Sequence, residues 1–234
     1  MHGIIRKELS QYFRSFTGYV YLAIFWPISG FYFVMTNIVP RSGDIKEFFS
    51  AISTVLLFVL PILTMRLFTE EKKQRTDELL LTAPVPVSRI ITGKFIATML
   101  VLLIASAVFI VYAVILAALG SLAPMEFIGN YLGFILMSCA FLAIGLFVSV
   151  LSDNQLVSAI VTYAVLLLFY TMDSLEAVTQ SKVLTYVIDF LSLQKHYVDF
   201  TYGILDPANI IYFLSLTALF LFLSVFALEK KRLD

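Results

Sequence analysis

Six stretches of this 234-residue chain carry no charged side chain and approach or exceed the length needed to cross a lipid bilayer. They cover residues 15–40, 48–65, 95–125, 127–152, 154–172 and 207–228. A spanning helix needs about 20 mostly apolar residues, and the strict alternation of outer-membrane barrel strands is absent. We therefore expect an all-α membrane protein. Its six-transmembrane-helix bundle would have helices near residues 18–38, 49–68, 88–119, 127–150, 155–171 and 209–228.

The composition agrees with a membrane protein. Apolar residues make up 60% of the chain and charged residues 14%, whereas soluble domains carry about 25% charged residues. So few polar side chains cannot cover a water-soluble globule, and 22 Phe with 12 Tyr require burial, which argues against disorder. The net charge of zero gives no indication of nucleic-acid binding, and a single cysteine, Cys139, excludes a disulfide framework.

The distribution of cations predicts the orientation. Only Arg41, Lys46, Lys182 and Lys195 fall in segments that would face one side of the membrane, and the other Lys and Arg residues face the opposite side. By the positive-inside rule the cation-rich side is cytoplasmic, so both termini of this multi-pass cell-membrane protein are expected there. A cleaved signal peptide is the alternative interpretation of the N-terminal segment, but the first apolar stretch is too long for one and is not followed by a cleavage site of small residues.

We treat residues 1–234 as one membrane domain with three segments outside the spans. Residues 1–17 contain an amphipathic helix that would lie flat in the headgroup layer, as an anchor, a partner-binding element or both. The largest cytoplasmic insertion runs over residues 69–94, and its part before the third expected helix is residues 69–87. Residues 173–207 form an exterior loop with one or two short helices before the last span.

The cytoplasmic insertion carries signals for a short helix. Thr76 can cap it, with Asp77 and Glu78 in the first turn, where the helix dipole favours acids. Prolines at 84 and 86 then stop it. The leucines at 79–81 form an exposed edge, which either another protein or the base of the bundle must cover.

The sequence shows no catalytic set. The two histidines, His2 and His196, lie outside the expected spans, and Gly93-Lys94 resembles the end of a phosphate-binding loop but is followed by Phe95. With Lys94 counted in the charged region before the third span, no ionisable residue lies deep within a span. This argues against an ion-coupled carrier and against a fixed pore. Energy for transport would have to come from another protein.

The run MRLFTEEKKQRTDELLLTAPVPVSRIITGK, residues 65–94, resembles the cytoplasmic signature of ABC-2-type transporter permeases. The likeness is greatest to the short gliding-motility-type permease subunits, and more distant to those serving copper-enzyme maturation. The basic N-terminal segment, the LSDNQ turn at 151–155 and the loop before the last span agree with it. At Arg75-Thr76-Asp77-Glu78 the chain departs from related sequences, which often have a glycine before the threonine.

The resemblance implies a membrane subunit of an ATP-driven exporter. Two permease subunits, identical or homologous, pair in the bilayer, and two separate ABC ATPase subunits bind ATP and Mg. This chain itself would bind no cofactor or metal and would not be an enzyme. Residues 69–87, here called the coupling segment, would seat a coupling helix on the ATPase. The implied contact residues are Glu70, Glu71, Lys72, Arg75, Thr76, Asp77, Glu78, Leu79, Leu80, Leu81, Pro84 and Val85, with Arg6, Lys7 and Glu8 as additional contacts.

Two alternatives stay open. In one, the chain is a non-transporting scaffold that passes ATP-driven motion to an extracytoplasmic partner through the 173–207 loop. In the other, it is a membrane enzyme of lipid metabolism, although no pair of carboxylates supports that chemistry. No sequence feature selects a cargo.

Overall fold

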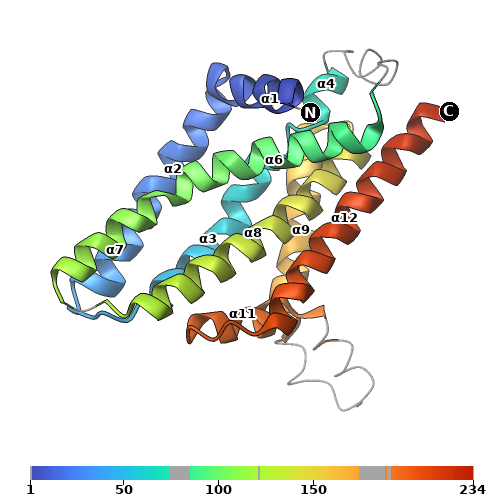
Figure 1. Cartoon of the computed structure of the whole chain (residues 1–234). Coiled ribbons are helices and arrows are strands. Elements are labelled where there is room, and N and C mark those ends of the chain that lie inside the picture. The colour runs from blue at the N-terminus through green and yellow to red at the C-terminus, as the bar shows by residue number, and fades with distance from the viewer. Residues whose placement is uncertain (1, 74–84, 121, 174–187, 189–190, 234) are drawn as a thin grey trace.

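The computed structural model describes residues 2–73, 85–120, 122–173, 188 and 191–233, and every regular element in these ranges is a helix (Figure 1). The helices are α1 (His2–Arg14), α2 (Phe16–Phe33) with the π-helical η1 (Val34–Ile38), α3 (Lys46–Thr64), α4 (Thr69–Lys73), α6 (Val87–Ser106), α7 (Val108–Ala118), α8 (Pro124–Leu151), α9 (Gln155–Thr171), α11 (Leu193–Thr201) and α12 (Pro207–Leu233).

Within the described residues, five helical stretches are long and apolar enough to cross a membrane. They are Phe16–Ile38, Lys46–Lys73, Val87–Ala118, Pro124–Leu151 and Pro207–Arg232. The shorter apolar helix α9 covers about 26 Å at 1.5 Å per residue, slightly less than the hydrocarbon core. The expected helical membrane bundle is confirmed.

Helix α8 lies in the middle of the bundle and packs against α3, α6, α9, α11 and α12. Glycines on α8 allow two of these close contacts. A Cβ atom on Gly129 would lie 2.7 Å from the Cα atom of Gly203, just after α11, and one on Gly133 would lie 2.6 Å from the Cβ atom of Phe200. A Cβ atom on Gly145 would lie 2.5 Å from the Thr64 hydroxyl at the end of α3. Small residues therefore set the distance of α3 and α11 from the central helix.

An aromatic cluster holds together the half of the bundle nearer α11. Phe48, Phe109 and Phe134 are fully buried and come from α3, α7 and α8. Their rings meet edge to face, with centroids 5.2 Å apart for Phe48–Phe109 and 5.3 Å for Phe109–Phe134. Such pairs add about 0.5–1.5 kcal/mol each beyond burial.

Both chain termini lie at the same end of the bundle, together with α1, α4, the start of α6 and the end of α8 (Figure 1). We call this the terminal end. Lys231 of α12 donates to the Val150 carbonyl, 3.0 Å away, and Arg232 donates to the Val85 carbonyl, 3.3 Å away. Helix α11 lies at the opposite end (Figure 1).

Candidate docking site at the terminal end

Helix α3 contains Pro61 and ends three residues later, at Thr64, where the chain turns. The turn over residues 65–68 leads into α4 and frees backbone groups that a continuous helix would have satisfied. Side chains of other helices satisfy two of them. The Leu67 carbonyl accepts from Lys94 Nζ at 2.7 Å, and the Phe68 amide donates to Ser149 Oγ at 3.1 Å. The base of the coupling segment is thus fastened to α6 and to α8.

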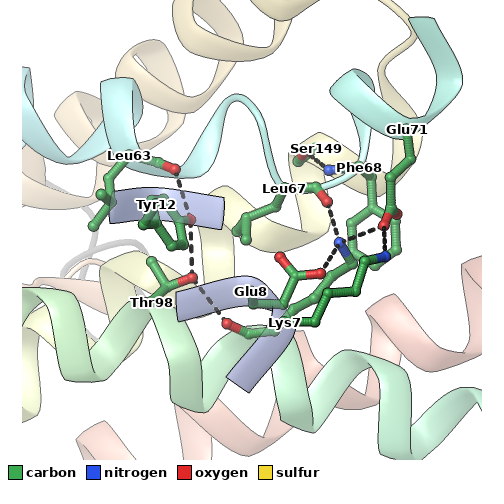
Figure 2. A network of polar contacts seen from close by, with 10 residues as sticks. Lys7, Glu8, Tyr12, Leu63, Leu67, Phe68, Glu71, Thr98 and Ser149 are labelled. Atoms are coloured by element: carbon green, nitrogen blue, oxygen red, sulfur yellow. Dashed lines mark hydrogen bonds and ion pairs between the residues drawn. The ribbon is translucent and has the colours of Figure 1, made fainter. Parts of the chain in front are cut away.

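The side chain of Lys94 is the centre of a buried ion cluster. Its ammonium nitrogen lies 3.0 Å from Glu8 Oε1, 3.1 Å from Glu71 Oε1 and 4.9 Å from the centre of the Phe68 ring. Lys7 Nζ lies 3.6 Å from the same Glu71 oxygen and is largely exposed. Figure 2 shows Glu8, Leu67 and Glu71 converging from three segments. Lys7, Glu8, Glu71 and Lys94 are called the Lys94 cluster below.

The charged groups of Lys94, Glu8 and Glu71 must pair with one another because they are buried away from water. Lys94 is 1% exposed, Glu8 5% and Glu71 6%. A single charge left unpaired in such a place destabilises a protein by several kcal/mol, whereas balanced pairs with additional hydrogen bonds are tolerated. The cluster contains two cations and two anions, and the Leu67 carbonyl supplies Lys94 with a neutral acceptor.

Helix α1 is seated directly on α6. A Cβ atom on Gly93 would lie 2.8 Å from Ile4 Cγ2, so the two helices meet without a gap. About two turns further along α1, the Tyr12 hydroxyl lies 3.2 Å from the Leu63 carbonyl oxygen of α3 and 3.2 Å from Thr98 Oγ1 of α6 (Figure 2). Burial raises the pKa of Tyr12, so its phenol stays neutral.

On its other side the coupling segment is tied to the end of α8. Lys72 Nζ donates to the Val150 carbonyl at 2.9 Å, to the Ser152 carbonyl at 2.6 Å and to Asp153 Oδ1 at 3.0 Å. A cation here is favourable because the last carbonyls of a helix carry partial negative charge. The hydrogen bond from Lys72 lowers the pKa of the Asp153 carboxyl, with the charge of Lys72 adding to the effect.

An open hollow of 690 Å³ lies beside these contacts. Its lining includes the cations Lys72, Lys73 and Lys231 and the polar turn before α9. Asn154 of that turn caps α9 by accepting from the Leu156 amide at 2.9 Å. The lining also contains Asp153, so three cations against one carboxylate give the hollow an excess of positive charge next to the described part of the coupling segment.

The structure places the predicted contact residues that it describes in three groups. Arg6 and Lys7 are exposed, whereas Glu8 and Glu71 face Lys94 and are not available at the surface of this chain. Glu70 pairs with Arg66, Lys72 binds the end of α8, and Val85 accepts from Arg232. The remaining contact residues lie outside the described residues, so their part in docking stays a prediction. They are Arg75, Thr76, Asp77, Glu78, Leu79, Leu80, Leu81 and Pro84.

Lys94 is the functional candidate that the sequence analysis missed. It was counted with the charged region before the third span, but it belongs to α6, about two turns from its start. Its position inside the predicted helix 88–119 was a usable signal, because a cation in an apolar helix requires a nearby acid. The sequence alone does not say which acids approach it.

A family model described as "ABC-2 family transporter protein" matches residues 14–174, more than half of the chain. The match includes the coupling segment and Lys94 and leaves out Lys7, Glu8 and Tyr12 of α1. No curated protein matches the chain. With its apolar helical bundle, this multi-pass membrane protein belongs to the ABC-2 transporter family and is a permease subunit of an ABC transporter.

Proposed function

We propose that this permease exports a substrate with energy from a separate ABC ATPase that docks at the terminal end, on the coupling segment. ABC-2 permeases generally work with ABC ATPase subunits. The observation that carries the proposal is that the base of the coupling segment is joined to α1, α6 and α8 at once. A push on this segment would therefore reach two membrane-spanning helices.

The described geometry changes the list of docking residues in one respect. Surface contact is assigned to Arg6, Lys7 and the cationic hollow, together with the predicted leucine edge at 79–81. Glu8 and Glu71 would act indirectly, because docking through their carboxylates would leave the buried Lys94 without its partners.

The distribution of cations supports a cytoplasmic terminal end. Lys and Arg residues of α1, α4, the start of α6 and the end of α12 gather there, whereas Arg41, Lys46 and Lys195 are outside this group. An excess of cations marks the cytoplasmic side of a membrane protein. The ATPase, with its ATP and Mg, would then meet the coupling segment in the cytoplasm.

The family resemblance implies a working unit of two permease subunits and two ATPase subunits, and we propose the same unit here. The proposed subtype of this permease is the short gliding-motility type. ATP binding would favour one arrangement of the ATPase pair, and the bundle would follow because the docked segment fits that arrangement better.

Docking is tested by co-expressing the chain with the candidate ABC ATPases of the same genome. We expect Leu80→Glu to reduce co-purification of the ATPase at least tenfold, because a carboxylate would replace an apolar contact. Leu205→Glu, a partly exposed leucine before α12, is the matched control and should leave co-purification unchanged. Equal recovery of the ATPase with both variants, together with unchanged ATP turnover, would contradict docking on this segment.

The second candidate function, force transmission to an extracytoplasmic partner, is favoured by the tight contact of α8 with α11. Asn130 Nδ2 of α8 donates to the Thr201 carbonyl at 3.0 Å, beside the two glycine contacts. Structures of the assembled complex with and without ATP distinguish the functions. An interface between permeases that stays sealed in both states would favour transmission, and a widening cavity would favour export.

A further inference from the structure

Three elements that are distant in sequence meet at one ammonium group. Lys94 on α6 binds Glu8 of α1, Glu71 of α4 and the carbonyl of Leu67 in the turn before α4, all within 3.1 Å. The neighbouring Gly93 holds Ile4 of α1 in direct contact. Helix α1 is therefore attached to α6 through Gly93 and Lys94, and α4 is attached through the same Lys94.

The charges of the Lys94 cluster oppose separation of any one element. Moving α4 away would remove Glu71 from both Lys7 and Lys94 and leave Lys94 with Glu8 as its one carboxylate. Moving α1 away would remove Glu8 and Lys7 together. Each departure carries a buried charge away from its partner, which is the costly way to break a buried pair.

The contacts that residues 68–73 make with the end of α8 and the turn after it include charged groups that lie nearer to water than Lys94 does. They consist of the neutral bond from the Phe68 amide to Ser149 and the bonds of Lys72 with Asp153 and two carbonyls, and the Asp153 side chain is 86% exposed. The bonds of Lys72 are charge-assisted as well, but its side chain is 14% exposed against 2% for Lys94 and borders the open hollow. Water can therefore replace the partners of Lys72 when α4 moves, as it does for exposed ion pairs, more readily than those of Lys94. If the terminal end yields, it yields between α4 and α8 first.

We propose that Lys94 is a positioning residue that makes α1, α4 and the start of α6 move as one unit, with the yielding joint between this unit and the end of α8. This inference rests on the proposed function for the source of the motion. The unit itself is a property of the chain alone and is tested there.

The first experiment uses hydrogen–deuterium exchange on the full chain in lipid nanodiscs. Lys94→Met by itself would leave two buried carboxylates with one exposed cation and is expected to lower stability. The informative variant is therefore the triple change Glu8→Gln, Glu71→Gln and Lys94→Met, which removes the ions together. We expect it to fold and to exchange the backbone amides of residues 2–14 at least tenfold faster than the unmodified chain. Lys72→Met, the matched control on the other face of α4, should leave that exchange unchanged.

The second experiment adds the ATPase, with ATP and vanadate to hold the closed state. In the unmodified chain, exchange should change together in residues 66–73 and in the first turns of α6. In the triple variant we expect the change at 66–73 to persist while α6 no longer responds.

The outcomes of these experiments distinguish the role of Lys94 from the proposed docking site. Unchanged protection of α1 in the triple variant, or an α6 response equal to that of the unmodified chain, would overturn the role of Lys94. A complex in which ATP changes nothing at 66–73 in the unmodified chain would instead overturn the proposed docking site, and the protection of α1 would still decide whether Lys94 holds the unit together.

Discussion

Tyr12 illustrates how a single hydroxyl contributes at the terminal end. It lies beside the Leu63 carbonyl, one of the carbonyls left free where α3 ends, and beside Thr98. We expect Tyr12→Phe to lower the free energy of unfolding by about 1–2 kcal/mol, because a buried acceptor loses its donor. Thermal unfolding in detergent measures this, with the exposed Tyr19→Phe as control. Equal losses in the two variants would contradict the assigned role.

The carboxyl of Asp153 gives a pH dependence of defined sign. Lys72 lowers the pKa of Asp153 below the ordinary value of 3.8, so its stabilising contribution is present above that value and disappears as the pH falls through the lowered pKa. Between pH 5 and pH 8, Asp153→Asn should therefore show a constant difference of about 0–1 kcal/mol from the unmodified chain, decreasing in high salt. A difference that changes steeply within this range would show that another group governs it.

The sequence indicates which charged residues gather at the terminal end, but it does not indicate which side chains they pair with. Within the amphipathic helix expected in residues 1–17, Glu8 was predicted to contact the ATPase, whereas the structure buries it against Lys94. The reason is that the side of α1 that carries Glu8 packs against α6, whose Lys94 lies 86 residues later in the chain. Only the packing of α1 on Gly93 brings those charges together.

Among the helices, those bounded by local signals were predicted most closely. The α9 bounds agree with the predicted 155–171. Asn154 caps the start of the helix, and the uncharged stretch that contains the helix lies between Asp153 and Asp173. Helix α3 was predicted to end at 68 but ends at Thr64, and α6 gives way to α7 at Ala107. The end of α3 depends on partners in α6 and α8 for the turn that follows, and such partners are not readable from local sequence.

The contact between α8 and α11 can be tested through Gly129. A methyl group there would meet the backbone of Gly203 and Phe200 at 2.7 and 2.9 Å, and backbone cannot move aside as a flexible side chain can. We expect Gly129→Ala to destabilise the protein by about 1–3 kcal/mol and to speed amide exchange in residues 193–201. Gly30→Ala is the control, because its methyl group would meet only the Tyr112 hydroxyl, at 3.5 Å. Unchanged exchange in α11 would mean that α11 is not held by this contact.

For the whole chain, the orientation is a prediction from charge alone. In a Cys139→Ala background, Lys230→Cys should react with a membrane-impermeant maleimide only after cells are permeabilised, because the terminal end is expected to face the cytoplasm. Ile204→Cys, between α11 and α12, should react in intact cells. Labelling of Lys230→Cys in intact cells would reverse the orientation.

The class of the molecule was readable from sequence because it depends on quantities that local sequence contains, namely apolar length and charge distribution. The Lys94 cluster was not, because it depends on how α1, α4 and α6 cross. The resemblance at residues 65–94 agrees with the matched family, which covers residues 14–174, and the docking of a partner on that segment is still to be measured.

Cross-linking in the assembled transporter is the measurement that decides where the energy enters. A photoreactive amino acid placed at residue 80 should capture the ATPase in native membranes, and the same group at residue 205 should not. The extent of capture should change when ATP and vanadate are added. Capture of the ATPase from residue 205 and none from residue 80 would contradict the account, because the motor would then act on a different part of the permease.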